Sequence, residues 1–209
     1  MRKSTVVSLN KLRIFDILFR NRLLLILYFM FAIGILLGVI SFKNSDVSAN
    51  ISEKLFSFYI SKRISGNFIS IMFSSAVISF LALIASFLLG ASVMGIVVSP
   101  LFVSFLGFIY GEITAYIYSS YALNGIAFNA IVFIPSTAVL LISLIIACKY
   151  SVNFSLCIAR LTFSNCISRN LYEEFKTYCR SYFVISAFII LSALLDALLS
   201  KILFKFFDF

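Results

Sequence analysis

Two acidic residues lie inside long apolar stretches of the sequence and are the first candidates for chemistry. Glu112 ends an uncharged run that begins after Arg63, and Asp196 lies in an apolar stretch near the C-terminus. Apart from Lys201 near the end of the stretch around Asp196, no basic residue shares the apolar stretch of either acid. An acid at the centre of a membrane costs about 2.5–3.5 kcal/mol to insert. We therefore expect both side chains to face protein or water and not lipid.

Glu112 and Asp196 are predicted to act as polar ties between helices. One hypothesis brings the two carboxyls together, or into one polar cavity. One of them would then stay protonated, because two adjacent carboxylates cannot both ionise cheaply. The alternative is that each carboxyl bonds separately to backbone groups or to Ser and Tyr hydroxyls.

Other residue types that carry catalysis or bind metals are scarce. The chain has no His, which removes the commonest general base and the commonest metal ligand. No Ser has an obvious activating base, and no glycine-rich loop fits a nucleotide. The sequence thus predicts a protein that is not an enzyme and that uses no metal or cofactor. Four Cys residues, none in a C-x-x-C pair, are expected to be free thiols: Cys148, Cys157, Cys166 and Cys179.

Glycine pairs are the most prominent pattern in the apolar stretches. Gly34 and Gly38 form one G-x-x-x-G motif, and Gly107 and Gly111 form a second. Small residues four apart leave a flat stripe on a helix, so that a second helix backbone can approach closely. The motifs predict helix packing, either within one chain or between copies in a homo-oligomer.

The elements that carry these residues must be membrane helices. The chain is 62% hydrophobic and 12% charged, whereas soluble domains are about half apolar and about a quarter charged. The net charge of +9 predicts that the protein associates with the anionic surface of a lipid bilayer and not with nucleic acid. As one helix, the uncharged run 64–111 would be about 72 Å long, enough to cross a core about 30 Å thick twice. Gly90, Gly95 and Pro100 mark the predicted turn, and Gly90 and Gly95 are also expected to take part in helix packing.

These observations predict an all-α polytopic bundle with five transmembrane helices in a single membrane domain, 1–209. Asn124-Gly125 predicts a further, exposed turn, and Pro135 predicts a kink within the fourth span. Amphipathic interfacial helices are expected at 4–21 and 51–65, the latter with Ile51, Leu55, Phe58 and Tyr59 on its apolar face, and along 149–180 on the membrane surface. The five predicted spans are 22–42, 68–90, 98–120, 125–148 and 181–204.

Basic residues predict the orientation of the bundle. With five spans and the N-terminus inside, 11 of the 17 Lys and Arg residues fall on the cytoplasmic side. Because cytoplasmic loops carry the excess of Lys and Arg, we expect the N-terminus in the cytoplasm and the C-terminus outside.

The order of small residues along the chain resembles the stage II sporulation protein M family. The resemblance covers nearly the whole chain. It is carried by the segment 89–95 (LGASVMG), by the motif 107–111 (GFIYG), by Gly125 and Pro135, and by the segments 154–156 (FSL) and 195–197 (LDA).

This resemblance implies a non-enzymatic scaffold in the cell membrane. Members of the family act in forespore engulfment, in a complex with peptidoglycan-degrading proteins that the scaffold recruits or localises at the septum. The sequence also leaves open a small transport or permease subunit, because the run around Gly90–Pro100 is broken, Pro135 kinks a span and two acids are buried.

Overall fold

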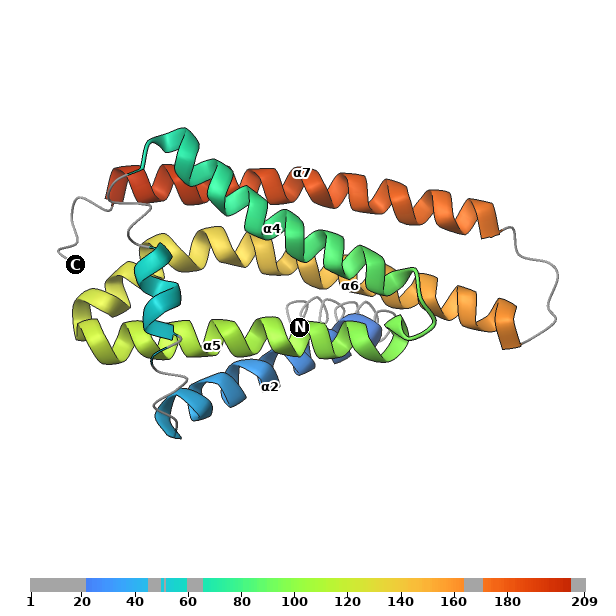
Figure 1. Cartoon of the computed structure of the whole chain (residues 1–209), viewed down its shortest axis with the longest axis horizontal. Coiled ribbons are helices and arrows are strands. Elements are labelled where there is room, and N and C mark those ends of the chain that lie inside the picture. Colours follow the sequence, from blue (N-terminus) through green and yellow to red (C-terminus); the bar gives the residue numbers. More distant parts are fainter. Residues whose placement is uncertain (1–21, 45–49, 51, 60–65, 164–170, 204–209) are drawn as a thin grey trace, which may run out of the picture.

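The computed structural model describes residues 22–44, 50, 52–59, 66–163 and 171–203. The regular elements in these ranges are all helical, which confirms the predicted all-α bundle. A short helix covers residues 52–59 and crosses one end of the bundle (Figure 1). The longer elements are α2 (Arg22–Asn44), α4 (Phe68–Gly90), α5 (Gly95–Phe128), the π-helical stretch η1 (Asn129–Phe133), α6 (Ile134–Phe163) and α7 (Leu171–Leu203).

Four helical stretches in the described ranges are long and apolar enough to cross a membrane. Three of them are α2, α4 and α7, apart from a terminal residue of α7. The remaining stretch, Gly95–Thr162, contains α5, η1 and all of α6 except its last residue. Within it, α5 and α6 lie side by side and run in opposite directions (Figure 1). This stretch therefore passes through the bundle twice.

The reversal between α5 and α6 begins at Ala122. Its backbone angles, φ 43° and ψ −122°, are not helical, and its φ is positive, which is uncommon for a residue other than glycine. The turn expected at Asn124-Gly125 is exposed at Asn124 but not at Gly125, which is buried. A Cβ at Gly125 would meet the carbonyl of Ile117, so the exposure predicted for this glycine is wrong.

Pro135 lies in the first turn of α6, immediately after η1. Proline lacks the N–H that would close an α-helical turn, and π-helical turns often occur where the regular ladder is interrupted. Two hydroxyls next to the proline bond to carbonyls of the preceding turn: Ser136 donates to Phe133 at 3.2 Å, and Thr137 donates to Ile134 at 3.2 Å. Local side chains thus satisfy the irregular backbone at this point.

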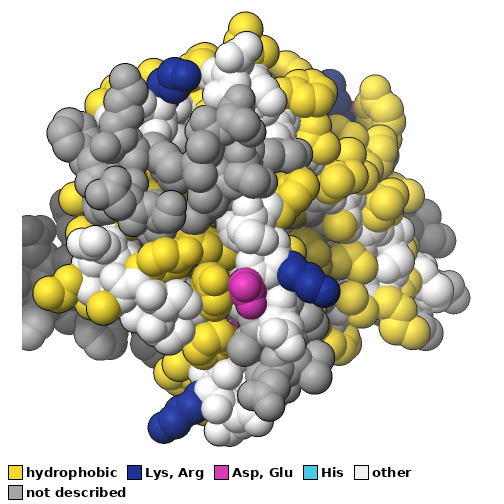
Figure 2. All heavy atoms as spheres, turned by 60° about the vertical axis from the view of Figure 1, so that its left-hand side comes forward, with side chains coloured by type: hydrophobic (Ala, Val, Ile, Leu, Met, Phe, Trp, Pro, Cys, Tyr) yellow, Lys and Arg dark blue, Asp and Glu magenta, His cyan; other side chains and the backbone are white. Residues whose placement is uncertain are grey.

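The helices pack in two groups. α2 lies along α5, and α4 rests across α6 and α7 (Figure 1). Leu27 of α2 and Val103 of α5 meet Ile145 and Cys148 of α6 in a buried cluster that joins the groups. The face of the bundle in Figure 2 carries areas of hydrophobic side chains with scattered charges. Such a surface fits contact with lipid.

The segment 149–180 differs from its prediction. It was expected to lie on the membrane surface as one amphipathic loop. Instead α6 continues without a break to Phe163, and α7 already begins at Leu171. The polar residues of this segment therefore extend the two transmembrane helices beyond the α4–α5 turn (Figure 1).

The helix 52–59 meets the bundle through Phe56, a residue outside its predicted apolar face. Phe56 is 2% exposed and packs against Phe128, Tyr116 and Tyr121, whereas Leu55 and Phe58 are exposed. Aromatic side chains of the bundle form a pocket for the Phe56 ring. This contact determines which side of the short helix faces the protein. The amphipathic helix predicted at 4–21 lies outside the described residues.

Candidate functional site

The glycines of α2 face the backbone of α5. A Cβ at Gly34 would meet the carbonyl of Ser104, and a Cβ at Gly38 would meet the carbonyl of Phe108. Both glycines are buried. Neither position has room for any side chain, so the first G-x-x-x-G motif lies in a backbone-to-backbone contact within the chain.

The glycines of α5 make the reciprocal contact. A Cβ at Gly107 would meet the carbonyl of Phe31, and one at Gly111 would meet the carbonyl of Ile35. The residue numbers rise together on the two helices, so α2 and α5 run parallel. The two motifs thus pack against each other, an arrangement in which small residues let helix backbones approach closely in a membrane.

Glu112 lies at the edge of this contact. Its side chain is buried, at 6% exposed, and the Ser41 hydroxyl of α2 donates a hydrogen bond to its carboxyl. Its backbone nitrogen is 3.0 Å from the position that a Cβ on Gly38 would occupy. Glu112 therefore adds a polar link to the glycine contact between α2 and α5.

We expect Glu112→Gln to be mild and Glu112→Leu to be harmful. An amide oxygen still accepts from Ser41, whereas leucine leaves that hydroxyl without this partner at a cost of about 1–3 kcal/mol. Thermal unfolding of the purified variants in detergent checks this. Equal unfolding temperatures for the Gln and Leu variants would contradict the polar link.

Asp196 of α7 has its own surroundings. Its side chain is 4% exposed, and its carboxyl accepts a hydrogen bond of 3.1 Å from the Tyr59 hydroxyl. It lines a cavity of about 400 Å³ whose wall is formed by the 52–59 helix and by α4, α5, η1, α6 and α7. The polar side chains that share the cavity wall with it are Tyr59, Ser74, Ser75, Ser79, Ser136, Thr137 and Ser192.

Tyr110 of α5 lies close to this acid. Its ring stacks on Phe133, with ring centroids 5.2 Å apart, and its hydroxyl lies in the neighbourhood of Tyr59 and Asp196. Among the described residues this buried hydroxyl has no hydrogen-bond partner. The Asp196 carboxyl thus has two tyrosine hydroxyls nearby, one from the 52–59 helix and one from α5.

The two acids therefore have different partners. Glu112 bonds to Ser41 of α2, and Asp196 bonds to Tyr59 of the 52–59 helix. Glu112 does not line the cavity that Asp196 lines. These contacts match the alternative in which Ser and Tyr hydroxyls hold each carboxyl separately, and they join α5 to α2 and α7 to the 52–59 helix.

Gly90 and Gly95 lie at the turn between α4 and α5, next to hydroxyl groups from α6 and α7. Ser155 donates to the Gly90 carbonyl at 3.0 Å, and its hydroxyl occupies the space that a Cβ on Gly95 would need. A Cβ on Gly90 would meet Ser151 and Tyr178. The segments around 89–95 and 154–156, which are far apart in sequence, therefore form one contact.

A ladder of hydroxyl bonds continues from this turn into the bundle. Ser151 donates to the Ser86 carbonyl at 2.9 Å, and Tyr182 donates to the Ala147 carbonyl at 3.1 Å. The Ser86 hydroxyl also lies 3.2 Å from the Tyr182 hydroxyl. These bonds tie α4, α6 and α7 together where apolar packing alone gives little specificity.

Tyr182→Phe should lower stability by about 1 kcal/mol, because it removes a buried hydroxyl that bonds to a carbonyl while keeping the ring. The matched control is Tyr172→Phe on the same helix, since Tyr172 is 72% exposed. Chemical or thermal unfolding of the two variants measures the difference. An unchanged Tyr182→Phe variant would show that the ladder contributes nothing to stability.

Which hydroxyls hold the two acids, and where the Tyr110 hydroxyl lies, could not be predicted from the sequence. Tyr59 and Tyr110 lie far from Asp196 in sequence, and only the fold brings them close. Ser151 and Ser155 are different, because two serines four residues apart share one face of a helix. That spacing was a signal that could have identified the contact with α4.

In a chain without His, the acidic and Cys side chains are the candidates for binding a metal. The described residues contain no group of three or more such side chains that could hold a metal ion. Cys148, Cys157 and Cys179 are free thiols, and Cys166 lies outside the described residues.

The fold and its buried contacts define a polytopic α-helical membrane protein. The family described as Stage II sporulation protein M matches residues 27–201, which is most of the chain, and the protein belongs to that family. The match includes both glycine motifs, Pro135 and both buried acids. No curated protein and no solved structure is similar enough to the chain to count as a match.

Proposed function

We propose that the protein is a non-enzymatic membrane scaffold that recruits or localises peptidoglycan-degrading enzymes during forespore engulfment. The observation that carries this proposal is membership of the stage II sporulation protein M family over residues 27–201. The contacts of the predicted key residues agree with a structural role. The glycines bring α2 and α5 together, and Glu112 and Asp196 bond to hydroxyls of neighbouring segments.

The end of the bundle that carries the 52–59 helix is the proposed contact surface. With the N-terminus in the cytoplasm, as the basic residues predict, this end faces the cell wall. Buried Phe56 fixes the short helix, while Leu55 and Phe58 are 44% and 52% exposed. A fixed helix with exposed apolar side chains is a suitable docking point for a secreted or anchored enzyme.

Co-purification from sporulating cells tests the proposal. The tagged full-length chain should bring down peptidoglycan-degrading enzymes, which mass spectrometry identifies. The paired variant Leu55→Ser/Phe58→Ser should reduce this capture while the protein remains folded. The control is Ile69→Ser/Phe73→Ser on α4, a pair that is also apolar and is more exposed. Capture of no such enzyme by the unchanged chain would refute the scaffold function.

A small transport or permease subunit is the second candidate function. The observation that favours it is the cavity of about 400 Å³ with Asp196 in its wall, because buried acids in membrane proteins often lie on ion or proton paths. A pH-sensitive dye inside vesicles that contain the purified chain tests this candidate. Proton flux that Asp196→Asn abolishes would favour transport, whereas equal flux through empty and protein-containing vesicles would exclude proton transport.

A further inference from the structure

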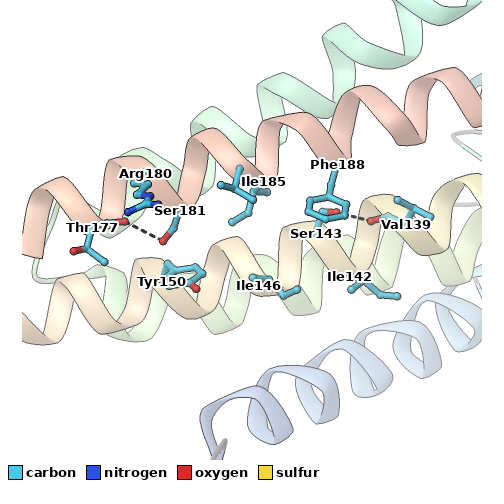
Figure 3. A pocket seen from close by; sticks show the side chains of 11 residues that line it. Val139, Ile142, Ser143, Ile146, Tyr150, Thr177, Arg180, Ser181, Ile185 and Phe188 are labelled. Atoms are coloured by element: carbon cyan, nitrogen blue, oxygen red, sulfur yellow. Dashed lines mark hydrogen bonds between the residues drawn. The ribbon is translucent and has the colours of Figure 1, made fainter.

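A groove of about 450 Å³ runs between α6 and α7 and is separate from the Asp196 cavity (Figure 3). Tyr150 of α6 and Arg180 of α7 lie at the same end of it (Figure 3). Ile142 and Phe188 lie toward the other end and are 48% and 51% exposed. The groove is thus polar at one end, apolar along its length and open to the surroundings of the bundle.

The polar end carries a cation and a hydroxyl that are both available to a ligand. Arg180 is exposed, and its guanidinium has no carboxylate partner within the described ranges. The Tyr150 hydroxyl likewise has no hydrogen-bond partner among those residues. A guanidinium beside a hydroxyl donor suits a phosphate group, because both donate hydrogen bonds to its oxygens.

The position of Arg180 matches the level of lipid headgroups. Along α7, Arg180 and Lys201 are about 32 Å apart by helical rise, close to the thickness of a bilayer core of about 30 Å. The groove follows α6 from Tyr150 to Val139, about 16 Å, which is about the depth of one leaflet. Its polar end therefore lies where a headgroup lies, and its apolar length lies where an acyl chain lies.

We propose that this groove binds one anionic phospholipid. The lipid phosphate contacts Arg180 and Tyr150, and one acyl chain lies against Ile142, Ile146 and Phe188. The lipid belongs to the leaflet on the side of the helical extensions of α6 and α7. The basic residues predict that this leaflet is cytoplasmic, and anionic lipids there supply such headgroups. The bound lipid would also fill the space between α6 and α7 at this depth.

Tryptophan fluorescence tests the site, because the chain contains no Trp. Phe188→Trp places a single reporter in the groove. Ile190→Trp places one at nearly the same depth on the same helix, at a residue that is 47% exposed and does not line the groove. Each full-length variant is reconstituted in phosphatidylcholine with increasing fractions of brominated phosphatidylglycerol or brominated phosphatidylcholine, and the quenching by the two brominated lipids is compared.

We expect the reporter at 188 to show about a fivefold preference for phosphatidylglycerol, and the reporter at 190 to show none. Arg180→Gln should remove the preference at 188, and Arg160→Gln, which removes the same charge from an exposed site at the same end of the bundle, should keep it. Ile142→Trp fills the apolar end of the groove. It should therefore reduce the amount of lipid that stays bound to the protein in native mass spectrometry. Equal preferences at 188 and 190, or a preference that Arg180→Gln leaves unchanged, would overturn the proposal.

Discussion

Replacing Gly111 with leucine should lower the unfolding temperature by about 6–12 °C and sharply reduce the yield of folded protein. A Cβ at this position would already meet the carbonyl of Ile35, so a leucine side chain must force α2 and α5 apart. Overpacking of a core costs about 1–3 kcal/mol, and in a chain of this length each kcal/mol shifts the midpoint by about 2–4 °C. We expect the upper end of that range because the obstacle is backbone, which cannot rotate away.

Ala32→Leu is the matched control for Gly111→Leu. Ala32 is exposed on the outer side of α2, so the same added bulk meets no protein backbone. Size-exclusion chromatography in detergent and thermal unfolding compare the two variants. If both lose the same amount of folded protein, the added bulk and not the α2–α5 contact is responsible, and the packing account of the glycine motifs is wrong.

Asp196→Leu should be the second most damaging change, with a loss of about 1–3 kcal/mol. The Tyr59 hydroxyl donates to this carboxyl at 3.1 Å, and leucine leaves the buried end of the cavity without this acceptor. Asp196→Asn should lose much less, because its amide oxygen still accepts. Unfolding of the purified variants in detergent gives the comparison.

A second substitution separates the lost bond from other effects at Asp196. Tyr59→Phe removes the stranded hydroxyl, and replacing both partners by apolar groups can be nearly neutral. We expect Tyr59→Phe/Asp196→Leu to be more stable than Asp196→Leu alone. Losses that simply add in the double variant would show that the 52–59 helix is not held through this bond.

The sequence predicted the elements of the bundle better than their contacts. Long uncharged runs must be helical in a bilayer, because unpaired backbone groups are too costly there. G-x-x-x-G motifs mark close packing, but the motif alone does not say which helix it meets, and only the structure pairs Gly38 with α5 and Gly111 with α2. The same limit applied to Glu112 and Asp196, since burial was predictable and the partners were not.

Apolar spacing did not identify the residues through which the helices contact other parts of the protein. In a membrane protein the outer face of a helix is as apolar as the inner face, so periodicity carries less information than it does in water. Leu55 and Phe58 are exposed, while Phe56 fills an aromatic pocket that belongs to distant parts of the chain. Gly125 was similarly expected to be exposed, because the sequence did not reveal how tightly the chain turns back on Ile117.

Reconstitution with a captured peptidoglycan-degrading enzyme tests the central claim, that the chain supplies position and not catalysis. Vesicles with and without the full-length chain are mixed with the enzyme and with purified peptidoglycan. Bound enzyme and released glycan fragments are then measured separately. We predict that the chain alone releases no fragments and that it raises the amount of enzyme on the vesicles. Fragment release by the chain alone, or equal enzyme binding to empty vesicles, would contradict the scaffold account.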